Sequence, residues 1–80
     1  MRLPSAVIKS HCDELEYYQQ KLCLKDNGTN TEEILFLVRQ FEQARSQMLA
    51  TKDFGKALTI FFNLLQDTRV YPLMEKYGLR

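Results

Sequence analysis

The sequence predicts an all-α fold, a small antiparallel helical bundle of three main helices plus a short fourth. Apolar residues recur at steps of three and four in three segments, and no segment shows the alternation of a β-strand. Hydrophobic residues make up 45% of the 80 residues, which is enough for a globular core. The connections are short, so consecutive helices are expected to be antiparallel neighbours. We expect a single helical domain over residues 1–80, either a protein by itself or a fragment or subunit of a larger assembly.

The first helix is predicted from about Pro4 to Leu24. Proline suits a first helical turn, because its missing N–H would have no partner there. The next residues, Asp26-Asn27-Gly28, interrupt the pattern and favour a turn, since Asn and Gly tolerate left-handed backbone angles. One stripe of this helix is apolar and should face the core: Ile8, Cys12, Leu15, Tyr18 and Leu22.

The second helix is predicted from about Thr31 to Ala50. Asn30 with Glu33, or Thr29 with Glu32, has the spacing of a capping box at its start. Its core face is the most regular in the chain: Ile34, Leu37, Val38, Phe41, Ala44, Arg45 and Met48. Only Arg45 is polar there, and we expect its stem to lie on apolar surface with its head in water. Three more residues widen the apolar face: Leu35, Phe36 and Leu49.

The third helix is predicted over about residues 52–66, with Thr51 as its cap. Its middle, residues 57–65, is apolar nearly all round, which is typical of a helix at the centre of a bundle or covered by a partner. Because Pro72 disfavours helix at the residue before it, a short fourth helix is predicted to begin near Pro72 and to end at Gly78. Its apolar face would be Leu73, Met74 and Tyr77.

Residues 41–64 carry the pattern of two closely packed helices. They read Phe41-x-x-Ala44-Arg45-x-x-Met48, then Lys52-Asp53-Phe54-Gly55-Lys56-Ala57-x-x-x-Phe61-x-x-Leu64. This pattern resembles a tetratricopeptide-type helix hairpin, of which the chain shows one unit. The resemblance implies that Ala57 lets the helices approach, while Phe54 and Phe61 fill the space beside it.

Residues 41–79 carry a second resemblance. The pattern Ala57-Leu58-x-Ile60-Phe61-x-x-Leu64, then Val70-x-x-Leu73-Met74-x-x-Tyr77-Gly78-Leu79, is similar to the first half of the N-terminal domain of transcription elongation factor S-II. Tyr77 stands where that family has Thr. The resemblance implies a small helical bundle that docks disordered peptides from transcription machinery.

No recognisable catalytic, cofactor-binding or metal-binding constellation is present, so we expect a protein that is not an enzyme. His11 and Cys12 are neighbours on a helix and point about 100° apart, which prevents a nucleophile–base pair. A structural zinc commonly needs four ligands in close pairs, and the chain has one His and two distant Cys. Cys12 and Cys23 are instead expected to be partly buried and to act as small apolar residues.

The two cysteines also indicate a compartment. On one helix they would lie about 16 Å apart, too far for a disulfide. Two unpaired thiols suit a reducing environment, and Met1-Arg2-Leu3-Pro4 lacks the apolar run of a secretory signal. We expect an intracellular protein, cytoplasmic or nuclear, and no membrane span, because no run of about 18 apolar residues exists.

The surplus of apolar helix surface predicts a protein–protein interaction module, such as an adaptor or a complex subunit. The partner would be an amphipathic helix in a groove or a second copy forming a homodimer. We expect the docking surface at Phe36, Phe62, Tyr71, Met74 and Tyr77. The alternative is a helical domain of transcription machinery that contacts nucleic acid through Lys52, Lys56 and Arg69. A formal net charge of +1 makes a nucleic-acid partner the less favoured choice.

Overall fold

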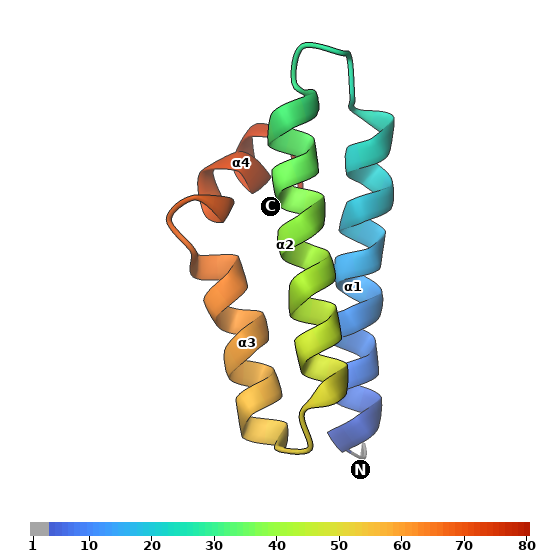
Figure 1. Cartoon of the computed structure of the whole chain (residues 1–80), viewed down its shortest axis with the longest axis vertical. Coiled ribbons are helices and arrows are strands. Elements are labelled where there is room, and N and C mark those ends of the chain that lie inside the picture. Colours follow the sequence, from blue (N-terminus) through green and yellow to red (C-terminus); the bar gives the residue numbers. More distant parts are fainter. Residues whose placement is uncertain (1–3) are drawn as a thin grey trace.

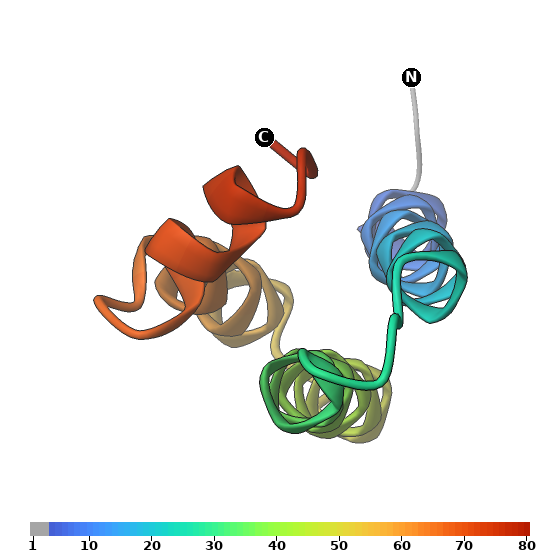
Figure 2. The same ribbon diagram turned by 90° about the horizontal axis from the view of Figure 1, so that it is seen from above.

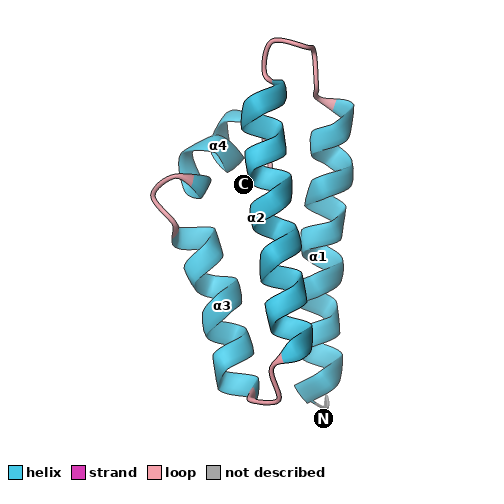
Figure 3. Cartoon of the chain, viewed as in Figure 1, coloured by secondary structure: helices cyan, strands magenta, loops and turns pink. Residues whose placement is uncertain are grey.

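Four helices form the part of the chain that the computed structural model describes, residues 4–80. They are α1 (Pro4–Leu24), α2 (Thr31–Ala50), α3 (Phe54–Gln66) and α4 (Val70–Lys76), as labelled in Figure 1. These residues contain no strand, as Figure 3 shows. The predicted all-α bundle of three main helices and a short fourth is therefore confirmed.

The three long helices run antiparallel to one another in the order of the sequence, and α2 is the central helix of the three (Figure 1). It packs against both α1 and α3, which meet each other over a smaller area. Figure 2, which looks along the bundle, shows α4 lying across the end of α3. The molecule measures 42 × 22 × 20 Å and is elongated, because α1 and α2 set its length.

The core follows the predicted stripes closely. On α2 the five residues with least exposure are Ile34, Leu37, Phe41, Ala44 and Met48. The head of Arg45 differs from expectation, since it reaches polar groups on α1 instead of extending into water. Its Nη1 donates to Oε1 of Gln19 at 3.1 Å, and its Nη2 lies 3.8 Å from the Glu16 carboxylate.

The turn between α1 and α2 forms where Asp26-Asn27-Gly28 predicted it. Gly28 has a φ of +86°, in the left-handed region that glycine enters at low cost. The predicted capping box is wrong, because Asn30 is the N-cap residue but makes no side-chain cap bond. The loop is held instead by Asp26, whose Oδ1 accepts from the hydroxyl of Thr31 at 2.7 Å.

The start of α3 lies two residues later than predicted. Asp53, not Thr51, is the N-cap, and its Oδ1 accepts from the backbone N–H of Lys56 at 3.1 Å. A carboxylate in this position satisfies a free N–H and also complements the positive end of the helix dipole. Thr51 stabilises the preceding turn, since its hydroxyl accepts from the N–H of Asp53 at 3.3 Å.

The fourth helix begins at Val70, earlier than the predicted start near Pro72. Proline is its third residue, where the missing N–H would have no helical partner, so Pro72 is tolerated inside the first turn. The helix ends in a Schellman motif: N–H of Leu79 donates to the carbonyl of Met74, and N–H of Gly78 donates to that of Glu75. Gly78 takes a φ of +72°, and Leu79 returns into the core.

Candidate docking surface

Two of the five residues predicted to bind a partner lie in the core. Met74 is fully buried, and Tyr77 is only 8% exposed. The expectation that they face a partner is therefore wrong. The Schellman motif turns the chain after α4, and Leu79, which follows it, is buried in the same core.

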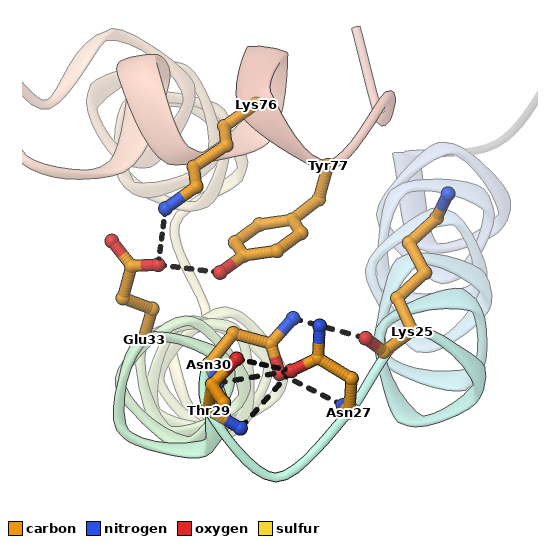
Figure 4. A network of polar contacts seen from close by, with 7 residues as sticks. All are labelled: Lys25, Asn27, Thr29, Asn30, Glu33, Lys76 and Tyr77. Carbon is orange, nitrogen blue, oxygen red and sulfur yellow. Dashed lines mark hydrogen bonds and ion pairs between the residues drawn. The ribbon is translucent and has the colours of Figure 1, made fainter.

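Tyr77 joins α4 to α2 through the carboxylate of Glu33 (Figure 4). The Tyr77 hydroxyl and the Lys76 ammonium both donate to Oε1 of Glu33, the latter at 2.7 Å. The bonds from Lys76 and Tyr77 hold the pKa of Glu33 below its ordinary value. The same contact raises the pKa of Tyr77 and of Lys76. Tyr77 therefore connects the end of α4 to α2 through a hydrogen bond.

The other three predicted residues, Phe36, Phe62 and Tyr71, contact different parts of the fold. Phe36 is half-buried, with the guanidinium of Arg69 5.4 Å above its ring. Phe62 is 49% exposed and lies edge-on to His11 of α1. Tyr71 is exposed beneath the guanidinium of Arg80. The three side chains thus have three different aromatic or cationic neighbours, and that they form one docking surface stays a prediction.

An apolar groove lies at the end of the bundle where α2 passes into α3. We call it the end groove; its volume is about 270 Å³, and its apolar lining is Ile8, Met48, Leu49, Phe54 and Ala57. Leu49 is 64% exposed and Phe54 is 39% exposed, so both offer apolar surface to solvent. Phe54 and Ala57 line the same groove, and Phe54 is partly open to solvent.

One signal in the sequence pointed to the end groove. Leu49 follows Met48, the last residue of the buried α2 stripe, and so lies off that stripe near the helix end. The sequence predicts that Leu49 widens the apolar face of this helix. What the sequence did not show is that Ile8 of α1 and Phe54 of α3 are brought beside it, because this depends on how three helix ends meet.

The electrostatic surroundings of the end groove favour negative charge. Helices α1 and α3 both begin at this end and α2 ends there, which places two positive helix ends against one negative one (Figure 1). Lys52 lines the groove, and Lys56 lies one turn further along the chain; both are exposed. The carboxylate of Asp53 also lines the groove, where it caps α3 and opposes part of this positive charge.

The thiol and imidazole of the only adjacent Cys–His pair have separate surroundings. Cys12 is buried, and burial raises the pKa of its thiol. The His11 ring instead stacks on Phe61 with 4.1 Å between ring centroids. Both thiols of the chain are free, and Cys23 is exposed, which corrects the expectation that it is partly buried. That the chain is not an enzyme stays a prediction.

The cations named for nucleic-acid contact are not brought together. Lys52 and Lys56 lie at the start of α3, and Arg69 lies beyond its end, a helix of 13 residues or about 20 Å away. Arg69 also has its Nε 3.6 Å from the carboxylate of Asp67. In residues 4–80 no three His, Cys, Asp or Glu side chains are grouped to hold a metal ion.

None of the helices described here combines the length and the apolar character needed to cross a membrane. The two family resemblances of residues 41–79 stay predictions. Comparison of the chain with models of protein families, with curated proteins and with solved structures found no match in any of the three.

Proposed function

We propose that this chain is a protein-interaction module that binds an acidic amphipathic helix of a partner protein in the end groove. The observation that carries the proposal is the exposure of two apolar side chains in the groove, Leu49 and Phe54, at an end of the bundle where two helices begin and where Lys52 and Lys56 are exposed. An amphipathic helix binds such a groove by inserting apolar residues from one face.

The size of the end groove favours side chains over a small-molecule ligand. Pockets for small ligands and cofactors commonly measure about 300–1,000 Å³ and enclose most of the ligand. The end groove measures about 270 Å³ and is open to solvent along the turn between α2 and α3. A volume of this size suits one or two inserted side chains, with the rest of the partner helix outside.

The exposed apolar side chains of the end groove would supply part of the energy of a reversible contact. Full burial of a Leu side chain gives about 1.5–3 kcal/mol, so covering the 64% of Leu49 that is exposed gives about 1–2 kcal/mol. Phe54 is exposed over 39% and adds about 1 kcal/mol. Lys52 and Lys56 would contribute at the rim, mainly by choosing acidic over basic partners.

The test uses a designed, fluorescently labelled peptide helix with Leu on one face and Glu on the other. Anisotropy should report binding to the whole chain, and Leu49→Ala should weaken it about 5–30-fold, the equivalent of the lost burial. Leu24→Ala is the matched control, because Leu24 is 88% exposed and lies at the other end of α1. It should leave the affinity unchanged.

Three results would contradict this function. Equal effects of the Leu49 and Leu24 substitutions would mean that the end groove is not used. Equal affinity for a peptide with Lys in place of Glu would remove the charge argument. Concentration-dependent sedimentation abolished by Leu49→Ala would show that a second copy occupies the groove.

The alternative, contact with nucleic acid, has less support because Lys52 and Lys56 lie far from Arg69. It predicts binding of labelled single- or double-stranded DNA that falls steeply with salt. Lys52→Ala with Lys56→Ala would then abolish DNA binding, whereas Leu49→Ala would not.

A further inference from the structure

The loop between α1 and α2 contains an asparagine followed directly by glycine. Asn27 and Gly28 are both exposed, and no atom beyond the two adjacent residues lies within 4 Å of the position that a Cβ on Gly28 would take. A backbone nitrogen can attack the side-chain amide of the preceding residue when nothing obstructs its approach, and glycine permits that approach best. The pair therefore has the elements of an intramolecular reaction.

The side-chain carbonyl of Asn27 is surrounded by hydrogen-bond donors. Its Oδ1 accepts from the backbone N–H of Thr29 at 3.0 Å, from the hydroxyl of Thr29 at 2.7 Å and from the backbone N–H of Asn30 at 3.2 Å (Figure 4). Donors aimed at a carbonyl oxygen stabilise the negative charge that develops when a nucleophile adds to its carbon. The loop thus polarises the Asn27 amide toward attack.

The attacking nitrogen is bonded to a carboxylate. The backbone N–H of Gly28 donates to Oδ1 of Asp26 at 2.9 Å. Hydrogen bonds from Gly28 and from the Thr31 hydroxyl lower the pKa of Asp26, so this carboxylate is ionised at neutral pH. Asp26 is therefore placed to accept the proton that the nitrogen must lose.

We propose that Asn27 is a site of spontaneous deamidation, assisted by Asp26 and by the donors of the loop. The Gly28 nitrogen forms a bond to Cγ of Asn27, and its proton passes to the Asp26 carboxylate. The bond from Cγ to Nδ2 then breaks, and the amide nitrogen leaves as ammonia with that proton. Water, the only co-reactant, opens the cyclic imide at either carbonyl and leaves aspartate or isoaspartate at position 27.

The two products affect the loop differently. Both lower the formal net charge of +1 by one unit, and aspartate also keeps the side-chain oxygen that the loop donors bind. Isoaspartate adds a methylene to the main chain, which shifts the backbone N–H of residue 27 that donates to Oδ1 of Asn30. Asn30 in turn donates to the carbonyl of Lys25 and precedes α2, so isoaspartate should loosen the joint between α1 and α2.

The experiment ages the folded full chain at neutral pH and follows the products by peptide mass spectrometry. Aspartate and isoaspartate should accumulate at Asn27, whereas Asn30 and Asn63 in the same chain serve as internal controls and stay intact. Gly28→Ala should suppress the reaction. Asp26→Asn keeps an acceptor of the same shape without a base and should slow it about tenfold, less than the ~100-fold that a positioned base gives in a buried site.

Urea supplies the decisive control. In the unfolded chain the bond from Gly28 to Asp26 is absent, so the effect of Asp26→Asn should disappear. An intact Asn27 in the aged chain would overturn the proposal. Equal deamidation rates for the folded wild type and the folded Asp26→Asn variant would also overturn it. So would an equal effect of Asp26→Asn with and without urea, because either result would show that the folded loop plays no part.

Discussion

Two adjacent phenylalanines of α3 provide a direct test of the packing. Phe61 is 2% exposed and stacks on His11, whereas Phe62 is 49% exposed and touches His11 only edge-on. Truncating a buried Phe costs about 3–5 kcal/mol. For Phe62 half of the usual burial is lost, which costs about 1 kcal/mol. The two substitutions are chemically identical, so the difference reports the different burial of the two rings and their different contacts with His11.

These costs are large for a chain of this size. At about 0.05–0.15 kcal/mol per residue, 80 residues give about 4–12 kcal/mol of total stability. Phe61→Ala should therefore leave the protein close to its unfolding threshold or beyond it. Phe62→Ala should lower Tm by about 4–8 °C.

Urea unfolding followed by far-UV circular dichroism measures both variants against the wild type. The midpoint should fall much further for Phe61→Ala, with an unchanged slope for Phe62→Ala because the surface exposed on unfolding stays nearly the same. Equal losses for the two variants would refute the assignment of Phe61 to the core and of Phe62 to the surface.

The remaining predictions concern titratable and reactive groups. The depressed pKa of Glu33 stabilises the fold above the ordinary value of 4.5, so this contribution should be lost as the pH falls through the lower pKa of the folded state; the Tm difference between wild type and Glu33→Gln should shrink there. The raised pKa of Tyr77 stabilises the fold below 10.0, the ordinary pKa of the group. This stabilisation should be lost as the pH rises above 10.0 through the pKa of the folded state, and melting curves at alkaline pH would measure the loss. Cys23 should react at once with a thiol reagent, whereas Cys12 should react only as the chain unfolds, because it is buried and the pKa of its thiol is raised. Equal reaction rates in the folded chain would contradict the placement of Cys12.

The sequence was sufficient to predict α1 and α2. Both helices have a regular apolar stripe, and the turn between them has residues that favour left-handed backbone angles. These signals are local, because each depends on residues three or four apart or on a single turn. The predicted bounds of these two helices agree with the structure for that reason.

The end of the chain was harder to predict because its structure depends on contacts between distant residues. Pro72 argued for a later start of α4, yet a proline in the first turn loses no hydrogen bond. Tyr77 is buried, and its hydroxyl donates to Glu33, a residue 44 positions earlier in the chain. Periodicity within α4 cannot show such a contact. The sequence therefore predicts that Met74 and Tyr77 bind a partner, whereas both are buried in the core.

The same reasoning explains why the end groove was missed although the surplus of apolar surface was recognised. Counting apolar residues shows that some must remain uncovered, but it does not show which. Some of the exposed large side chains, such as Tyr17 and Phe62, lie within helices, whereas others lie next to helix ends. Leu49 is the next-to-last residue of α2, and Phe54 is the first of α3. A docking surface at helix ends also receives the charge of the helix dipoles, which a surface on helix flanks does not. A search for binding surfaces in short helical bundles should therefore begin at apolar residues next to helix ends, where exposure and a directional charge occur together.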